Sequence, residues 1–121
     1  VSSEEVAEED CKGGIEFFKD EVSWDARDSF RWATRLNPRI ARYWSYYSLS
    51  MTKLPGMIIE AENAILEAIK LEPKNASHYI NLGTIYLKSG KMKRAHSQFE
   101  KALQLDPSNE RARRGLKKTK Q

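Results

Sequence analysis

The sequence is poor in the residues that cross-link a chain or interrupt its regular structure. Its 121 residues include one cysteine, four prolines and six glycines. Because Cys11 has no second cysteine to pair with, an internal disulfide is excluded, and we expect a reducing, cytoplasmic setting. Disordered and fibrous chains carry far more proline and glycine. With 40% hydrophobic residues, the chain is long enough to form one compact domain with its own core.

Long apolar stretches are also missing. No run approaches the length needed to cross a bilayer, so we expect no membrane association. The first residues carry no basic-then-apolar secretion signal. The sequence begins with Val1 rather than Met, and we expect it to be one part of a longer protein.

The chain lacks the constellations that mark catalytic and metal sites. His78 and His96 are 18 residues apart, and neither has a partner at ligand spacing, so we expect surface or half-buried structural roles for them. Cys11 has no adjacent pattern that would mark a nucleophile. No glycine-rich phosphate loop is present. We therefore expect no enzyme activity, no bound metal and no cofactor.

A repeat with a period of 34 to 35 residues organises the sequence. Four positions recur with internal spacings of 4, 3 and 5 residues, which places the first three on one face of a helix. The three copies are Ala26, Phe30, Ala33 and Pro38; Ala61, Ile65, Ala68 and Pro73; and Ala95, Phe99, Ala102 and Pro107. Such a period indicates an array of stacked helical units.

Further helical stretches fill the space between these copies, and none shows the alternation of a strand. The pattern predicts seven helices at about 5–20, 23–36, 40–54, 57–71, 76–89, 92–105 and 110–119. Asn75 and Asn109 suit the N-caps of two of them. Gly90 suits a left-handed C-cap. Gly83 and Ala95 are small enough for two helices to approach closely, with Tyr86 and Phe99 filling the gaps around them.

The third copy carries a recognisable motif. It reads Tyr79, Leu82, Gly83, Tyr86, Ala95, Phe99, Ala102 and Pro107. This spacing resembles the tetratricopeptide repeat (TPR) pattern, with Tyr79 in place of the usual Trp. The second copy is looser, with Trp44, Tyr47, Ser48 and Met51, and the first keeps Gly14 and Phe17.

The resemblance implies an all-α fold, an αα superhelix of three TPR helix pairs closed by a capping helix. We expect a single domain over residues 1–121. Its units would lie at about 7–40, 41–75 and 76–109, and its capping helix at 110–121. One such pair cannot bury its apolar face alone, whereas stacked copies can.

The same resemblance implies a peptide-binding groove on the concave face, lined by the first helix of each pair. Carried onto this chain, the predicted binding residues are Lys12, Lys19, Arg42, Tyr46, Leu49, Lys53, Asn81 and Lys88. Arg111 and Arg114 would border them. The cations could pair with carboxylates, Asn81 could bond a peptide backbone, and Tyr46 or Leu49 could anchor an apolar side chain. The competing interpretation is that these charges are only solvated.

Some TPR domains hold the terminal carboxylate of chaperone tails with a Lys/Asn/Asn/Lys/Arg clamp. At the corresponding positions this chain has Glu8, Lys12, Tyr46, Ser77 and Asn81. The clamp is not reproduced, so we do not predict binding of chaperone tails.

We therefore predict a non-catalytic protein-interaction module with a protein or peptide ligand, of which an acidic segment is the natural candidate. Two alternatives stay open. Residues 1–10 hold five acids, whereas residues 110–121 hold six bases and one acid, so oppositely charged ends could join copies into a homo-oligomer. The basic C-terminal helix could also make weak contacts with nucleic acid, which we regard as the less favoured reading.

Overall fold

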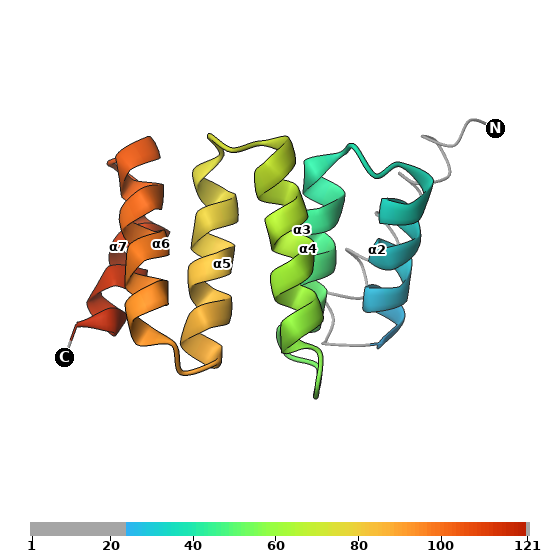
Figure 1. Cartoon of the computed structure of the whole chain (residues 1–121), viewed down its shortest axis with the longest axis horizontal. Coiled ribbons are helices and arrows are strands. Elements are labelled where there is room, and N and C mark those ends of the chain that lie inside the picture. The colour runs from blue at the N-terminus through green and yellow to red at the C-terminus, as the bar shows by residue number, and fades with distance from the viewer. Residues whose placement is uncertain (1–23, 121) are drawn as a thin grey trace.

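The computed structural model describes residues 24–120, and every regular element in that range is a helix. The helices are α2 (Trp24–Leu36), α3 (Ala41–Met51), α4 (Ile58–Leu71), α5 (Ala76–Lys88), α6 (Met92–Leu105) and α7 (Glu110–Thr119). They stand side by side in one row, with α2 and α7 at opposite ends (Figure 1). Six of the seven predicted helices are thus observed, and the seventh, at 5–20, lies outside the described residues.

The predicted helix over 40–54 is wrong at its C-terminal end, because α3 stops at Met51. The next residues form tight turns, in which Leu54 N donates to Met51 O and Met57 N donates to Leu54 O. Pro55 has no amide hydrogen and disfavours helical geometry at Leu54, so the helix cannot run into it.

The predicted caps are confirmed. Asn75 accepts a hydrogen bond from Ser77 N at 3.0 Å, and Asn109 accepts one from Ala112 N at 3.1 Å. After α5, Gly90 takes a positive φ of 74°. Lys91 N then bonds back to Tyr86 O at 2.8 Å, the six-residue closure that ends a helix on a left-handed glycine.

The recurring apolar frame forms the core. All nine alanine, phenylalanine and isoleucine members of the three copies are at most 1% exposed: Ala26, Phe30, Ala33, Ala61, Ile65, Ala68, Ala95, Phe99 and Ala102. Burial of each large side chain contributes roughly 1.5–3 kcal/mol. The alanines let the helices approach, and the larger side chains fill the space between them.

A second repeated feature ties each repeat to the proline before it. Trp44 Nε1 donates to Pro38 O at 2.8 Å, and the Tyr79 hydroxyl donates to Pro73 O at 2.7 Å. Arg113 Nη2 makes the matching bond to Pro107 O at 3.1 Å. In each case the donor lies six residues after the proline. The polar end of the long side chain at this position therefore satisfies a carbonyl at the turn between helices.

Candidate functional site

The row of helices curves toward the side that holds α3, α5 and α7. Of the helices in residues 24–120, α3 contacts α5 and α5 contacts α7, whereas α2 and α4 do not touch α6 or each other. Helices that alternate along the chain are therefore closer together on one side of the row than on the other. The side formed by α3, α5 and α7 is the inner, concave face.

A relay of side-chain hydrogen bonds crosses this concave face. Asn81 of α5 donates from Nδ2 to Ser45 Oγ of α3 at 2.9 Å. Its Oδ1 accepts from Arg111 Nη2 of α7 at 3.3 Å. One buried amide thus links three helices, and a group satisfied at both ends helps to fix their spacing.

The predicted site residues Arg42, Tyr46 and Leu49 belong to α3, one of the helices of the concave side. Arg42 is exposed, with its guanidinium 5.2 Å from the centre of the Tyr43 ring. Tyr46 and Leu49 are half-buried, and the ring of Tyr46 stacks on Phe30 at 5.5 Å. Lys53 is exposed but lies in the turn beyond α3. Helix α3 therefore carries two half-buried apolar residues and one exposed cation, and Lys53 follows in the turn.

The predicted residues of α5 are placed less uniformly. Lys88 is exposed in the last turn of the helix. Asn81, in contrast, is only 3% exposed. The expectation of an amide free to bond a peptide backbone is corrected here, because the relay already uses both ends of that amide. Lys12 and Lys19 lie outside the described residues.

A hollow of about 220 Å³ opens between α5 and α7; we call it the α5–α7 hollow. Its lining comprises Ile80, Thr84, Leu87, Phe99, Arg111, Arg114, Gly115 and Lys118. Three of these residues are cations and none is acidic. The described concave face is therefore most strongly basic at its C-terminal end.

Sequence reasoning placed Arg111 and Arg114 at the border of the groove but missed Lys118. The available signal was its register. Lys118 lies eleven residues after Pro107, as Thr84 does after Pro73 and Leu49 after Pro38. Because Thr84 lines the α5–α7 hollow, the same offset on α7 points to Lys118.

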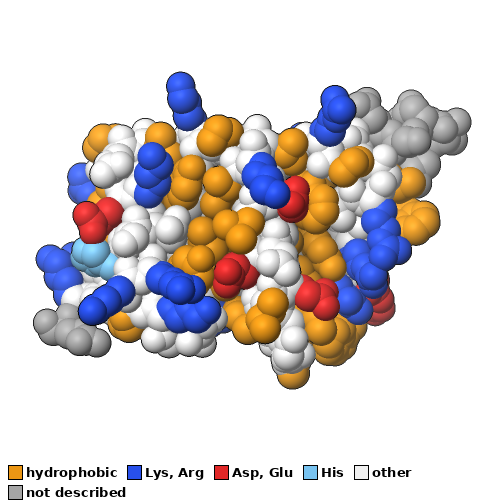
Figure 2. All heavy atoms as spheres, viewed as in Figure 1, with side chains coloured by type: hydrophobic (Ala, Val, Ile, Leu, Met, Phe, Trp, Pro, Cys, Tyr) orange, Lys and Arg blue, Asp and Glu red, His pale blue; other side chains and the backbone are white. Residues whose placement is uncertain are grey.

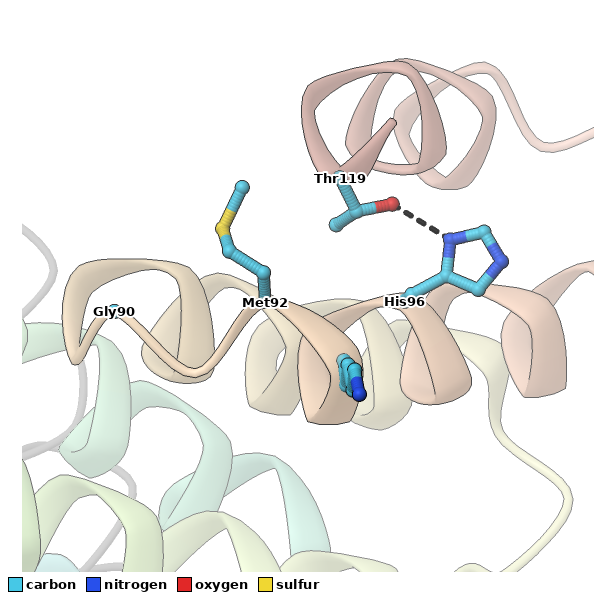
Figure 3. Close-up of a pocket in the computed structure, with 5 residues that line it drawn as sticks. Gly90, Met92, His96 and Thr119 are labelled. Atoms are coloured by element: carbon cyan, nitrogen blue, oxygen red, sulfur yellow. Dashed lines mark hydrogen bonds between the residues drawn. The ribbon is translucent and has the colours of Figure 1, made fainter. Parts of the chain in front are cut away.

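A larger hollow of about 550 Å³ lies between the start of α6 and the end of α7. In Figure 3, Met92 extends from α6 toward α7, and the His96 ring turns to Thr119. His96 Nδ1 lies 2.7 Å from Thr119 Oγ1, and its Nε2 lies 2.8 Å from Glu100 Oε1. The polar groups here already satisfy one another, so His96 anchors the end of α7.

The other histidine is more buried than expected. His78 is 3% exposed, and its Nε2 lies 2.7 Å from Glu72 Oε1. This hydrogen bond is the main reason that the pKa of Glu72 falls below its ordinary value. Within residues 24–120 no cluster of three or more histidine, cysteine or acidic residues is arranged to hold a metal.

The view in Figure 2 shows how apolar and basic side chains are distributed over one side of the molecule. Apolar side chains gather over α5 in the middle of this view, and lysines and arginines lie mostly on either side (Figure 2). Ile59 on α4 is 73% exposed. No helix in the described part of the chain is long and apolar enough to cross a bilayer.

Comparison with known proteins identifies the repeat directly. Residues 76–109 match the family model of the tetratricopeptide repeat. The chain is 30% identical to stress-induced-phosphoprotein 1 of Caenorhabditis elegans over 116 residues. This alignment covers 93% of the chain and 35% of that protein. It is 26% identical over 113 residues to the Hsp70-Hsp90 organizing protein of Triticum aestivum, and this alignment covers 93% of the chain and 19% of that protein. The chain thus spans only a minor part of each of these relatives.

Solved structures agree on the fold. The TPR domain of Arabidopsis OM64 superposes with a TM-score of 0.90 at 24% identity, covering 98% of both chains. The second TPR domain of human RPAP3, solved in complex with the HSP70 peptide SGPTIEEVD, superposes with a TM-score of 0.91 at 24% identity, covering 99% of both chains. Residues 76–109 are therefore a tetratricopeptide repeat, and the described chain has the all-α, solenoid-like fold of solved TPR domains.

Proposed function

We propose that the chain is a non-catalytic interaction module that binds an extended, acidic peptide segment on its concave face. One observation carries the proposal: α3 holds the half-buried Tyr46 and Leu49 together with exposed Arg42, and it belongs to the same side of the molecule as the basic α5–α7 hollow. Such a surface suits a peptide that combines one apolar side chain with carboxylates on either side of it.

The proposed contacts differ in what they contribute. An exposed ion pair to Arg42, Lys53 or Lys88 stabilises a complex by only about 0–1 kcal/mol. Affinity would therefore depend on an apolar side chain that buries area on Tyr46 and Leu49, with several cations acting together. Asn81 would act from beneath the surface by holding Arg111, rather than by touching the ligand.

Relatives support a peptide as the ligand class. Besides the human RPAP3 domain, the first TPR of Spaghetti (RPAP3) was solved bound to the HSP90 peptide SRMEEVD. The present chain carries Tyr46, Ser77 and Asn81 where the chaperone-tail clamp needs an amide and two cations. We therefore propose recognition of acidic side chains rather than of a terminal carboxylate.

The concave face shows no sign of catalytic chemistry in the described part of the chain. We propose that the module needs no cofactor and catalyses no reaction, because the polar groups of the described concave face form a hydrogen-bonded relay and a set of cations without a nucleophile and base. A single cysteine in 121 residues suits a cytoplasmic setting.

Selection from a displayed library of random 12-residue peptides would test the proposal. Enriched peptides would be synthesised, labelled and titrated by fluorescence anisotropy. We expect enrichment in Asp and Glu around an apolar residue. Arg42→Glu and Leu49→Asp should each weaken binding by about fivefold or more, the equivalent of roughly 1 kcal/mol.

Arg94→Glu is the matched control, because Arg94 is exposed on α6 and lies outside the concave face. It should leave the affinity within about twofold. The absence of any enriched peptide would contradict the proposal. So would peptides that bind Arg42→Glu and Leu49→Asp as well as they bind the unchanged chain. Circular dichroism would establish that each variant is folded.

Self-association is a second candidate, favoured by the charge of α7. This helix carries Arg111, Arg113, Arg114, Lys117 and Lys118 against the single acid Glu110, whereas residues 1–10 are acidic. Joining of the two ends would be weakened by salt. Light scattering at low and high salt tests it, and a monomer at both salt concentrations and high protein concentration would exclude it.

A further inference from the structure

The α5–α7 hollow has an excess of positive charge that nothing in the described chain balances. Arg111, Arg114 and Lys118 line it, and none of them forms an ion pair within residues 24–120. Elsewhere on α7 the situation differs: Arg113 lies 3.7 Å from Glu110 and donates to Pro107 O. The three cations of the hollow therefore have no carboxylate partner within residues 24–120.

One of these cations is held in place by the protein. Arg111 donates from Nη2 to the buried Asn81, which is itself bonded to Ser45. A guanidinium has five N–H donors, so this bond leaves others available. An arginine that is oriented before its ligand arrives loses less conformational entropy on binding.

A glycine lies in the wall of the hollow at a position where the other repeats carry larger side chains. Tyr46, Asn81 and Gly115 each lie eight residues after a repeat proline. At Gly115 the ring of Phe99 packs directly against the backbone, and both residues line the hollow. Lys118, Arg114 and Arg111 then surround a shallow basin floored by an aromatic ring and the methyl-bearing residues Ile80 and Thr84.

We infer that the α5–α7 hollow is a subsite for a phosphorylated side chain of the bound peptide. The inference rests on the proposed peptide-binding function and names the chemistry at one end of the groove. A phosphate monoester carries about −1.5 to −2 charges at pH 7 and offers three strong acceptor oxygens. Arg111 and Arg114 can bond such oxygens through their planar donors, and Lys118 supplies a third positive charge.

A carboxylate would also be attracted, but it balances only one of the three charges. We therefore expect phosphoserine to bind more tightly than glutamate at the same peptide position. Nucleic acid offers phosphates too, yet its backbone requires a stripe of cations along the surface. Arg111, Arg114 and Lys118 instead line one hollow, while Arg113 donates to Pro107 O in the turn before α7.

Two-dimensional amide NMR spectra test the subsite and do not require that the natural peptide ligand be known. The probe is O-phospho-L-serine, compared with N-acetyl-glutamate. With phosphoserine we expect shifts that saturate and concentrate at Thr84, Gly115 and their neighbours, and smaller shifts with the glutamate derivative. Lys118→Glu and the milder Arg114→Gln should each weaken phosphoserine binding by about tenfold.

Lys117→Glu is the control, since Lys117 is exposed on the same helix but does not line the hollow. It makes the same charge change and should alter the affinity by less than about twofold. Equal weakening by Lys117→Glu and Lys118→Glu, or shifts spread over all basic surfaces, would overturn the subsite. So would stronger binding of a 12-nucleotide oligothymidylate, with shifts extending to Arg113 and Lys117.

Peptides separate this inference from the proposed function. A peptide selected on the concave face would be made with serine, glutamate or phosphoserine at each position in turn. A phosphoserine peptide that binds about tenfold tighter only when Lys118 and Arg114 are intact supports both. If unmodified peptides bind, and Lys118→Glu does not change the affinity for the phosphoserine peptide, the subsite is refuted and the proposed peptide binding on the concave face stands. If phosphoserine binds saturably but no peptide binds, the proposed peptide binding on the concave face is refuted and phosphate binding in the hollow stands.

Discussion

The ring of Phe99 lies directly against Gly115, in the space that a side chain on Gly115 would occupy. A Cβ added to Gly115 would overlap Cε1, Cδ1 and Cζ of that ring, and one added to Gly83 would lie 2.8 Å from it. Phe99 of α6 is thus packed between two glycines, one on α5 and one on α7. This arrangement packs α6 closely against both α5 and α7 at the end of the array.

Gly115→Ala should therefore destabilise the domain. Alanine favours helix over glycine by about 1 kcal/mol, but forcing a methyl group into a packed contact costs typically about 1–3 kcal/mol. We expect a net loss on the order of 1 kcal/mol, measured by urea unfolding. Lys117→Ala, two residues further along the exposed face of α7, should change stability by less than about 0.5 kcal/mol. A Gly115→Ala domain as stable as the unchanged chain would show that Phe99 can move aside.

The Ser45–Asn81–Arg111 relay should be energetically coupled. Asn81→Ala removes the buried amide and leaves the Ser45 hydroxyl without its partner, which should cost about 1–3 kcal/mol. Asn63→Ala, at an exposed position of α4, serves as the control and should be near neutral. In a double-mutant cycle, Ser45→Ala should cost less once Asn81 is already alanine. Strict additivity of the two substitutions would contradict a direct interaction.

Stability at low pH should respond to Glu72. The hydrogen bond from His78, aided by one from Asn75, lowers the pKa of this carboxyl in the folded chain. Its contribution is fully present above the unfolded pKa of about 4.3 and is lost as pH falls through the lower folded pKa. Because the side chain is 50% exposed, we expect Glu72→Gln to cost under about 1 kcal/mol at pH 7.

The difference in unfolding free energy between Glu72→Gln and the unchanged chain should shrink as the pH falls below the unfolded pKa of about 4.3, and it should disappear once the pH is below the lowered folded pKa. Urea unfolding at a series of pH values measures it. Glu67→Gln removes an acid that pairs with Lys70 on the exposed surface and serves as the comparison. A Glu72→Gln difference that persists unchanged to pH 3 would rule out the His78 contact as its source.

A terminal carboxylate should contribute little to binding. Tyr46 and Ser77 carry no positive charge, and Asn81 is engaged in the relay. The peptide SRMEEVD and its C-terminal amide should therefore bind with dissociation constants within about twofold of each other, in fluorescence anisotropy titrations. Weakening of about tenfold on amidation would show that the chain captures the terminal carboxylate by other residues.

The parts of the fold that depend on local periodicity could be predicted from the sequence. The Ala26–Phe30–Ala33 frame and its two copies sit at helical spacing, and all three are buried as expected. Asn75 and Asn109 cap their helices because capping depends on neighbours two or three residues away. Such features need no knowledge of tertiary structure.

The parts that depend on contacts between distant helices could not be predicted. The bond partners of Asn81 lie 36 and 30 residues away in sequence, so its face on α5 was foreseeable and its burial was not. The α5–α7 hollow depends on how closely α7 packs against Phe99. The end of α3 was also missed: the helix stops at Met51, before Pro55, so Lys53 lies in a turn rather than in the predicted helix over 40–54.

The central claim is that the ligand lies on the face formed by α3, α5 and α7. Amide NMR spectra of the domain, recorded with and without a selected acidic peptide, test it most directly. We predict shifts concentrated at Arg42, Tyr46, Leu49, Thr84 and Gly115, with α4 and the outer residues of α6 unchanged. Shifts concentrated around Ile59, Leu66 or Arg94, with α3 and α7 silent, would contradict the account.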